Sequence, residues 1–335
     1  MRRKRSIAVG VFLLIAAAVY FGNASWRATP AANAGIRIIA HRGMHQTYDR
    51  TGIERDTCTA DRIGSPQHPY LENTVASMKA AFEAGADIVE LDVHPTTDGK
   101  FAVFHDWTLD CRTNGTGETR SHDMAHLKSL DIGYGYTPDG QNYPFRGKGI
   151  GLMPELKEVL AALPGQHFLV NFKSRETREG GMLADLVNAR PEWREAVWGA
   201  YGGDEPTRAA KKLMPDLNTW TRSGLKNCLL RYFSQGWLGR VPRSCRDTQV
   251  MLPVNVAPFM WGWPQLFIAR MRSVGSEVIL VGPVALGNFG VAGIDTREDY
   301  ARVPKDFDGY IWTNRVEVIA PLAGQIERTS VNLTQ

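Results

Sequence analysis

Two acidic residues lie close together in a stretch that reads as a β-strand. Glu90 and Asp92 occupy alternate positions of the apolar segment 88–93. Alternate side chains of a strand share one face, so both carboxylates point the same way, with Cα atoms roughly 6–7 Å apart. A cation between them best relieves their repulsion. Taken alone, such a pair is more often the wetted face of a sheet, so its meaning depends on the residues that accompany it.

Two histidines are placed to join the carboxylates. His105 ends a second predicted strand, 101–105, which a turn folds back beside the first, and His41 follows a short apolar strand predicted at 36–40. The imidazole pKa lies near neutrality, so histidine suits both proton donor and proton acceptor. Phosphodiester cleavage needs both, because the departing alkoxide must be protonated and the nucleophile activated. We therefore predict that this stretch is half of a metal-assisted phosphodiesterase site.

The elements that must position these residues alternate between strand and helix. A helix ending at Gly85 is expected before the acidic strand, with Asn73 or Thr74 as its N-cap. Eight strands, most followed by a helix, are predicted at 36–40, 88–93, 167–173, 196–200, 217–221, 249–254, 277–281 and 307–313. This alternation favours one α/β domain, a TIM (β/α)8 barrel with loop insertions. A doubly wound open sheet is the alternative, but the chain lacks the glycine-rich nucleotide turn of that fold.

Polar residues fall at or near the C-terminal ends of these strands, which is where the active residues of a barrel lie. They are His41, Glu90, Asp92, His105, Asn171, Lys173 and Thr313. Residues that only wetted the surface would not gather on one rim. Cations on that rim would neutralise the negative charge that develops at phosphorus during cleavage.

The composition excludes one class of partner. The 335 residues are 43% hydrophobic and 22% charged, and the net charge is +4. Four positive charges lie in residues 2–5, so the remainder of the chain is near neutral. Because neither a basic domain nor a recognition motif is present, we expect no nucleic acid partner.

The N-terminus is typical of an export signal. Basic residues 2–5 precede a fifteen-residue apolar run, 7–21, and small residues follow. Ala32-Asn33-Ala34 resembles a cleavage site, and Gly22-Asn23-Ala24 is a second candidate. We expect a cleaved signal peptide or an uncleaved anchor, so that the body is periplasmic, extracellular or held at the membrane outside the cytoplasm. The predicted organisation is a signal or anchor at 1–24, a linker at 25–35 and a barrel domain at 36–329.

Four cysteines fit an oxidising compartment. Cys58 lies in a polar loop and Cys111 lies just beyond His105, whereas Cys228 and Cys245 flank one segment. Three pairings are possible. Proximity and loop position favour disulfides between Cys58 and Cys111 and between Cys228 and Cys245.

Four ordered motifs resemble those of the glycerophosphodiester phosphodiesterases. They are His41-Arg42-Gly43, Glu72-Asn73-Thr74, Glu90-Leu91-Asp92 and His105-Asp106. The likeness covers roughly residues 36–325 and is strongest in the first half. It implies a TIM barrel, a divalent cation (Ca²⁺ or Mg²⁺) as cofactor, and hydrolysis of small glycerophosphodiesters to glycerol 3-phosphate and an alcohol.

The resemblance also implies how the matching residues share the chemistry. His41 and His105 are the catalytic acid and base, in an order that the sequence leaves open. Arg42 would bind a phosphate oxygen through its planar guanidinium, and Lys173 would neutralise developing charge. The nucleophile is either water or the glycerol hydroxyl of the substrate itself.

The implied metal site departs from the family at one position. Glu90 and Asp92 match the metal ligands, but the acid that normally lies two residues before the lysine is replaced by Asn171. An amide oxygen still binds a hard cation, but one negative charge is lost, so we expect either weaker metal binding or a different relative within the superfamily. Glu72 would support the site from beside it by orienting Arg42 and the ligands.

Two other functions stay open. On the same fold, a phospholipase-D-like enzyme would cleave lysophospholipids, with aromatic loops holding the acyl chain. Alternatively, Asn171 marks a catalytically weak binding protein, tethered to the membrane through an uncleaved N-terminal segment. His45 and His68, in the long loop between Gly43 and Glu72, are expected at the loop surface rather than in the chemistry.

Overall fold

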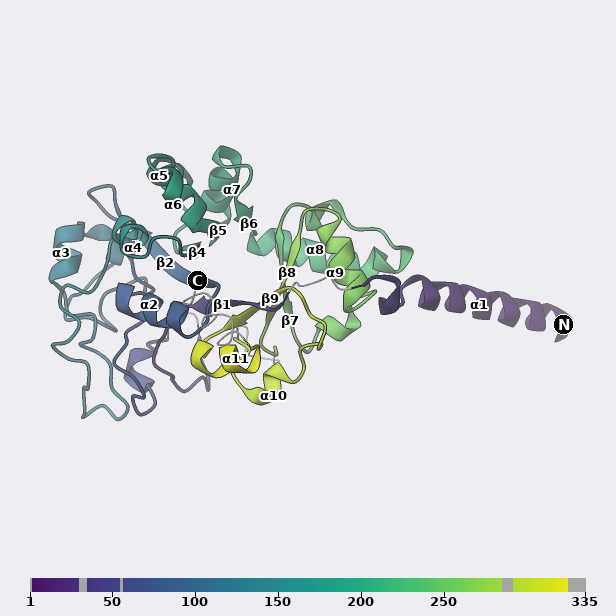
Figure 1. Ribbon diagram of the computed structural model, residues 1–335, viewed down its shortest axis with the longest axis horizontal. Helices are drawn as coiled ribbons and strands as arrows, with labels where there is room; N and C mark the ends of the chain where they lie inside the picture. The colour runs from purple at the N-terminus through teal and green to yellow at the C-terminus, as the bar shows by residue number, and fades with distance from the viewer. Residues whose placement is uncertain (1, 30–34, 55–56, 285–291, 325–335) are drawn as a thin grey trace, which may run out of the picture.

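The chain folds around one parallel sheet that curves into a barrel. The computed structural model describes residues 2–29, 35–54, 57–284 and 292–324, and Figure 1 shows how its elements are arranged. Eight strands are hydrogen-bonded in the order β6-β5-β4-β2-β1-β9-β8-β7. Their bounds are β1 (Arg37–His41), β2 (Ile88–Pro95), β4 (Phe168–Phe172), β5 (Val197–Gly202), β6 (Asn218–Thr219), β7 (Gln249–Pro253), β8 (Glu277–Val281) and β9 (Tyr310–Thr313). Each predicted barrel strand overlaps one of these.

The two end strands of this order, β6 and β7, meet through side chains. Thr248 Oγ1 donates to the carbonyl oxygen of Thr219 at 3.0 Å, and Gln249 Nε2 donates to Asn218 Oδ1 at 3.0 Å. The sheet is therefore a nearly closed parallel barrel, as predicted, and the open-sheet alternative is wrong. We call this line between β6 and β7 the seam.

One further strand lies off the barrel path. β3 (Phe101–Val103) pairs antiparallel with the end of β2, with Ala102 opposite His94. The strand is shorter than the predicted 101–105, so His105 follows the strand instead of ending it. The hairpin still carries His105 back toward the C-terminal end of β2.

Helices cover the outside of the sheet. They are α2 (Val75–Glu83), α3 (Met124–Ser129), α4 (Leu156–Ala162), α5 (Arg178–Asn188), α6 (Pro191–Ala196), α7 (Asp204–Leu213), α8 (Arg222–Gln235), α9 (Gln265–Arg272), α10 (Arg297–Tyr300) and α11 (Val316–Leu322). Thr74 is the N-cap of α2, because its hydroxyl accepts from the backbone N–H of Ser77 at 3.2 Å. Asn73, the other candidate cap, has a different partner, described below.

Strand residues alternate between the two sides of the sheet. Val89 and Leu91 are fully buried in the core between the sheet and the helices. Ile88 packs with Ile39 and Trp312 in a second cluster inside the barrel. Each fully buried aliphatic side chain stabilises the fold by about 1.5–3 kcal/mol. Because strand residues alternate, this packing turns the acidic side chains of β2 inward, as predicted.

The long connections after β1 and β3 fold together into a separate small core. Leu109, Leu127 and Phe145 are among its buried members. A disulfide between Cys58 and Cys111 joins the two connections, and a second joins Cys228 to Cys245. Both pairings agree with the prediction from the sequence.

Helix α1 (Arg2–Gly22) extends away from the barrel (Figure 1). Its C-terminal end is fixed by Asn23, which donates to the carbonyl oxygen of Trp237 at 2.9 Å and accepts from Arg270 Nη1 at 2.8 Å. Within residues 2–29, 35–54, 57–284 and 292–324, no helix is both long enough and apolar enough to cross a membrane. The predicted cleavage site at 32–34 and the predicted domain end at 329 lie outside the described residues.

Glu179, in the first turn of α5, is a buried acid outside the histidine cluster. The Ser174 hydroxyl donates to its Oε1, whereas its Oε2 has no hydrogen-bond partner among the described residues. Burial raises the pKa of Glu179 from 4.5 to about 7. The native state thus binds this proton more tightly than the unfolded chain, and the resulting stability is lost as pH rises from 4.5 to about 7.

Replacing this acid by its neutral amide is expected to stabilise the protein at high pH. At pH 8, Glu179→Gln should raise the free energy of unfolding by about 1–3 kcal/mol, because the neutral amide leaves no charge to bury. At pH 4 the variant and the parent should differ little, because the glutamate is then protonated in the native state. Urea unfolding at both pH values measures this, with the exposed Glu205→Gln as control. Equal effects at the two pH values would contradict the assignment.

Candidate active site

Asp92 lies at the centre of the polar cluster inside the barrel. Its side chain is fully buried. Oδ1 accepts a hydrogen bond from Asn171 Nδ2 at 2.8 Å and lies 3.5 Å from Lys173 Nζ. Oδ2 accepts from Asn73 Nδ2 at 3.0 Å and lies 3.2 Å from Arg42 Nε. Asp92 is therefore held by residues from three separate parts of the chain.

Glu90, two residues earlier on β2, is fully buried beside Asp92. Its Oε1 accepts from the hydroxyl of Tyr201 at 2.7 Å. Its Oε2 accepts from the backbone N–H of Arg42 at 3.2 Å and lies 3.8 Å from His41 Nε2. The two carboxylates thus share one face and have different partners.

The turn after β1 has an uncommon backbone that aims a guanidinium at this cluster. Arg42 has φ 59° and Asn73 has φ 58°, in the left-handed region that non-glycine residues rarely adopt. Gly43 follows with φ 77°, and a Cβ there would lie 2.9 Å from the carbonyl carbon of Ser77. The turn is therefore pressed against the start of α2. In this position Arg42 Nη1 donates to Glu72 Oε1 at 3.0 Å.

His41, the last residue of β1, is oriented from its far side. Its Nδ1 lies 2.6 Å from Asn314 Oδ1, and Asn314 Nδ2 in turn donates to Asp295 Oδ2 at 2.7 Å. Because Asp295 fixes the amide nitrogen of Asn314, the amide oxygen faces the ring and the imidazole proton belongs on Nδ1. The Nε2 lone pair is then free to accept from Arg42 Nε, at 3.1 Å.

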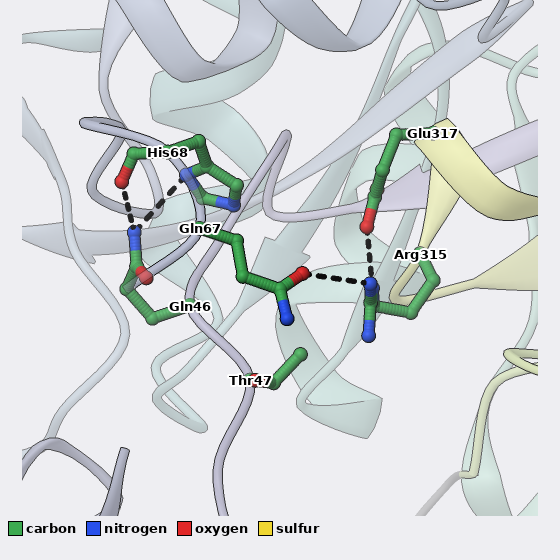
Figure 2. Close-up of a pocket in the computed structure, with 6 residues that line it drawn as sticks. All are labelled: Gln46, Thr47, Gln67, His68, Arg315 and Glu317. Carbon is green, nitrogen blue, oxygen red and sulfur yellow. Dashed lines mark hydrogen bonds and ion pairs between the residues drawn. The ribbon is translucent and has the colours of Figure 1, made fainter. Parts of the chain in front are cut away.

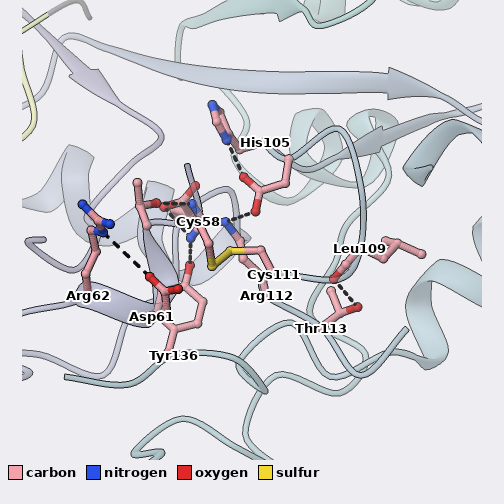
Figure 3. Close-up of a disulfide and its surroundings, with 12 residues drawn as sticks. Cys58, Asp61, Arg62, His105, Leu109, Cys111, Arg112, Thr113 and Tyr136 are labelled. Atoms are coloured by element: carbon pink, nitrogen blue, oxygen red, sulfur yellow. Dashed lines mark hydrogen bonds and ion pairs between the residues drawn. A yellow bond between two sulfur atoms is a disulfide. The ribbon is translucent and has the colours of Figure 1, made fainter. Parts of the chain in front are cut away.

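His105 is oriented in the same way by the residue that follows it. Its Nδ1 lies 2.6 Å from Asp106 Oδ1, so the ring donates through Nδ1 and presents Nε2 on the opposite side (Figure 3). Asp106 Oδ2 lies 2.8 Å from Arg112 Nε. Arg112 Nη1 lies 3.3 Å from Glu72 Oε2. Arg112 therefore bridges the carboxylate that orients His105 and the carboxylate that binds Arg42.

Arg112 is itself held by the small core of the insertions. It is buried, and it donates to the hydroxyl of Tyr136 at 2.6 Å and to Thr59 Oγ1 at 2.7 Å. Its neighbour Cys111 forms the disulfide with Cys58, next to the arginine in Figure 3. The long insertion thus supplies a structural part of the site.

The two histidines are joined by an unbroken series of contacts. It runs through His41, Arg42, Glu72, Arg112, Asp106 and His105. Both imidazoles also lie near enough to Asp92 to influence its pKa. Every predicted site residue, Lys173 and Asn171 included, is therefore brought to one cluster.

Burial keeps both imidazoles neutral. It lowers the pKa of His105 to about 4, with the positive charges of Arg42 and Lys173 acting in the same direction. It also holds the pKa of His41 well below its usual value, again with Arg42 adding to the effect. Near pH 7 each ring therefore has a lone pair on Nε2.

The carboxylates of the cluster outnumber its permanent cations by one. The acids are Glu72, Glu90, Asp92 and Asp106, and the cations are Arg42, Arg112 and Lys173. Burial alone would raise the pKa of Asp92, but Lys173 and Arg42 hold it well below its usual value. Burial and the charge of Asp92 raise the pKa of Glu90 to about 8. Among the described residues, Glu90 is thus the acid of this cluster that forms no ion pair with an arginine or a lysine.

Four residues of the cluster were not expected to have these roles. Arg112, Tyr201 and Asn314 were not singled out as site residues, and Asn73 was considered only as a helix cap. Asn73 lies inside a motif that resembles the family, and Asn314 directly follows the last predicted strand, so both positions offered a usable signal. Arg112 and Tyr201 carry none, because their roles depend on contacts between segments far apart in the sequence.

The two loop histidines, His45 and His68, are both less exposed than expected, and His45 is the more deeply buried. His45 is only 5% exposed, and its ring centroid lies 6.0 Å from that of His41, so its placement at the loop surface was wrong. His68 is half-buried in loop contacts that Figure 2 shows, with Gln46 Nε2 3.0 Å from its Nδ1 and 2.9 Å from its carbonyl oxygen. Arg315 and Glu317 of the same pocket pair with each other. His68 therefore has a structural role.

The oxygen donors in the cluster suit a hard divalent cation, although few of them are carboxylates. Glu90 and Asp92 are two buried carboxylates on one face, and Glu90 lacks a permanent cation. Asn171 directs its amide nitrogen, not its oxygen, at Asp92. Within the described parts of the chain, no group of three or more His, Cys, Asp and Glu side chains is arranged to hold a metal. A cation here would have two acidic ligands and, after rotation of the amide, the Asn171 oxygen.

Comparison with known sequences points to one family. Residues 41–195 match the model of the glycerophosphoryl diester phosphodiesterase family. A glycerophosphodiester phosphodiesterase of Caldanaerobacter subterraneus is 37% identical over 150 residues, which are 44% of this chain and 58% of that protein. One from Bacillus subtilis is 39% identical over 114 residues, 32% of this chain and 38% of that protein. The chain thus spans less than two thirds of the length of these relatives.

Solved structures extend the likeness of fold to most of the chain. A glycerophosphodiester phosphodiesterase from Agrobacterium tumefaciens has a TM-score of 0.57 at 21% identity, covering 86% of this chain and 99% of that one. An Oleispira antarctica phosphodiesterase, solved with the product sn-glycerol-3-phosphate, has a TM-score of 0.53 at 18% identity, covering 88% and 97%. At such identities the likeness shows the fold, a TIM barrel, including the part beyond residue 195.

Proposed function

We propose that this chain is a member of the glycerophosphodiester phosphodiesterase family and hydrolyses glycerophosphodiesters to glycerol 3-phosphate and an alcohol. One observation carries the proposal: two neutral, oriented imidazoles are held in one cluster by an unbroken series of contacts. Two sequence relatives are named for this activity, and one structural neighbour holds the product of such a reaction.

The exposed parts of the cluster fit a phosphodiester. The side chains of His41, His105 and Lys173 are 12%, 23% and 21% exposed, whereas Glu90 and Asp92 are fully buried. A substrate that approaches from solvent therefore meets two imidazoles and an ammonium group before it meets Glu90 or Asp92. This order avoids repulsion between the anionic substrate and the acids.

In this proposal the imidazoles divide the proton transfers between them. One Nε2 accepts the proton of the attacking hydroxyl, and the other, protonated once the anionic diester is bound, donates to the departing alkoxide. Asn314 and Asp106 hold the tautomers through the Nδ1 atoms of His41 and His105. Lys173 binds the phosphoryl oxygens and stabilises the charge that develops on them, and Arg42 supports it from the cluster.

A divalent cation, Ca²⁺ or Mg²⁺, is proposed as the cofactor. Glu90 and Asp92 would hold it, with the amide oxygen of Asn171 as a neutral third ligand. When bound, the cation supplies a Lewis acid for the phosphoryl oxygens. Two observations support this proposal. Glu90 forms no ion pair with an arginine or lysine among the described residues, and both carboxylates lie on one face of β2.

The activity is tested with the purified full-length chain and glycerophosphocholine. We expect glycerol 3-phosphate and choline as products in the presence of Ca²⁺ or Mg²⁺. Lysophosphatidylcholine is the parallel substrate, because release of choline from it would indicate the phospholipase-D-like alternative. Binding of glycerophosphocholine without any product would indicate a binding protein. Absence of product from every diester, with His41→Ala changing nothing, would refute the hydrolase.

Removal of divalent metal is expected to abolish most of the activity. EDTA followed by gel filtration should lower kcat at least about 100-fold, because charge at phosphorus is then stabilised by Lys173 and Arg42 alone. Added Ca²⁺ or Mg²⁺ should restore it, at higher concentrations than a site with three acids would need. Asp92→Asn should not be restored by either ion. Full activity of the metal-free protein would contradict the proposed cofactor.

We also propose that the barrel is exported, with residues 1–24 as signal peptide or anchor. The basic and apolar pattern of the N-terminus supports this, and so do the two disulfides. Mass spectrometry of the protein from fractionated cells measures both processing and thiol oxidation. An unprocessed, cytoplasmic protein with four alkylatable thiols would contradict the proposal.

A further inference from the structure

A cavity of about 470 Å³ opens at the seam of the barrel, and the mechanism makes no use of it. Its wall is formed by the end of α7, the end of β6, the start of α8 and the turn η5 (Arg243–Cys245) before β7. This volume lies within the range of about 300–1,000 Å³ that small-molecule sites occupy. Because main-chain pairing is replaced by side-chain contacts at the seam, space is available there.

The wall of the cavity is positively charged. Its lining residues are five basic side chains, four threonines, Ser244 and Trp220, and no carboxylate is among them. The five basic residues are Arg208, Lys211, Lys212, Arg243 and Arg246. The surrounding segment 217–246 contains six basic residues and no acidic one. The positive charge of the wall therefore disfavours a cationic ligand and favours an anionic one.

Three of these cations have no acidic partner among the residues that the structure describes. Arg208 lies 3.1 Å from Asp204, and Lys211 lies 3.0 Å from Asp247. Lys212, Arg243 and Arg246 form no ion pair with any residue that the structure describes. Their charge is thus uncompensated at the mouth of the cavity.

The turn that carries the two arginines is fixed in place. Cys245 lies between Ser244 and Arg246 and is bonded to Cys228 of α8. The Cys245 backbone N–H donates to the carbonyl oxygen of Pro242 at 3.0 Å. The hydroxyl of Ser244, which lines the cavity, is buried and has no hydrogen-bond partner among the described residues. A buried hydroxyl without a partner leaves a donor available to a ligand.

We propose that the seam cavity is a second binding site, specific for a phosphate ester. Guanidinium groups bind phosphate oxygens through paired N–H groups, lysine adds charge, and serine and threonine hydroxyls complete such sites. Trp220 supplies an apolar surface for the rest of the ligand. The phosphate comes either from a soluble organic phosphate or from the headgroup of an anionic lipid. None of the residues that line this cavity belongs to the histidine cluster, and the proposal does not depend on hydrolytic activity there.

Isothermal titration of the full-length chain with glycerol 3-phosphate tests the proposal. The parent should show two binding events, and Arg42→Ser should weaken the one at the histidine cluster. Arg243→Ser/Arg246→Ser should weaken the other roughly 10- to 100-fold, because two charge-assisted contacts are lost. Lys212→Ser, at the end of α7, should weaken the same event and serves as a second variant if the double variant is unstable. Trp220 is left unchanged, because it stacks on Tyr201 at 4.3 Å.

The matched control is Arg297→Ser/Arg302→Ser. These two exposed arginines lie on and next to α10, remote in sequence from the seam, and their removal changes the net charge equally. The control should keep both binding events. Turnover of glycerophosphocholine should be the same in the seam variant, the control and the parent, which separates this site from the catalytic one. A single event in the parent that Arg42→Ser abolishes, or equal binding by seam variant and control, would overturn the proposal.

Cosedimentation with vesicles distinguishes the two sources of the phosphate. The probes are phosphatidylcholine vesicles with and without phosphatidylglycerol. Binding that requires phosphatidylglycerol and is lost in Arg243→Ser/Arg246→Ser, but not in the control, identifies a lipid headgroup. Seam binding of glycerol 3-phosphate without vesicle binding identifies a soluble ester. If the seam variant bound both glycerol 3-phosphate and the phosphatidylglycerol vesicles as well as the parent does, both sources of the phosphate would be refuted.

Discussion

His105→Ala is expected to lower kcat on glycerophosphocholine by about 10²- to 10⁴-fold, the usual contribution of a positioned acid or base. KM should change little, because the substrate phosphate is bound chiefly by Lys173. Steady-state assays at saturating metal measure both constants. The effect should exceed that of any substitution outside the cluster.

The control for this substitution is His126→Ala. His126 is exposed on α3, outside the cluster, so its loss removes an imidazole without touching the site. His105→Ala should keep the unfolding transition of the parent, because its main polar partner, Asp106, still pairs with Arg112. A kcat within about threefold of the parent would mean that His105 is neither acid nor base.

Arg112→Met is expected to reduce both stability and activity strongly. It leaves Glu72 and Asp106 buried without their shared cation, and breaking a buried ion pair typically costs about 3–5 kcal/mol. Asp106 would no longer be fixed, so the orientation of His105 would be lost and kcat would fall. Urea unfolding and steady-state assays of one preparation measure the two effects. Arg112→Lys should recover part of the stability, because it keeps the charge but not the fork.

The pH dependence of this loss distinguishes an electrostatic cause from lost packing. Arg112 holds the pKa of Asp106 below its ordinary value, and burial opposes the charged form of both acids. Depressed acid pKa values contribute stability above the pKa of the unfolded chain, and this contribution is lost as pH falls. The difference between Arg112→Met and the parent should therefore be largest near pH 7 and should shrink below about pH 4.

Arg120→Met is the matched control for Arg112. Arg120 lies in the same insertion, pairs with Glu118 and Glu176, and lies over the ring of Trp107, but it is 29% exposed. Partly exposed pairs contribute about 0–1 kcal/mol. Equal destabilisation by the two substitutions would mean that the bridge between Glu72 and Asp106 has no special role.

The sequence contains most of the information for the barrel. Alternating apolar positions located each of its strands, and the alternation in β2 correctly directed Glu90 and Asp92 inward. The period-two pattern is a local property, so it is visible without any knowledge of the partners. The shortened β3 was missed at its end, because whether His105 belongs to the strand depends on pairing with β2.

The composition of the cluster was predictable, but its internal contacts were not. The residues at strand ends were expected on one rim because parallel strands end at the same edge of a barrel. Arg112 lies in an insertion without periodicity, and its partners Asp106 and Glu72 are 6 and 40 positions away. No local sequence pattern therefore predicts its role. His45 was placed at the surface because the loop is polar, yet the fold turns that side chain toward His41.

The position of the disulfide between Cys58 and Cys111 links the oxidation state of these cysteines to the geometry of the site. The bond closes next to Arg112, the one cation shared by the carboxylates that align His105 and Arg42. With the two thiols reduced, this cross-link between the insertion and the preceding loop is absent, and Arg112 depends on its ion pairs and hydrogen bonds alone. Reduction of this bond is therefore expected to loosen the support of Arg112 and, through Asp106, the orientation of His105.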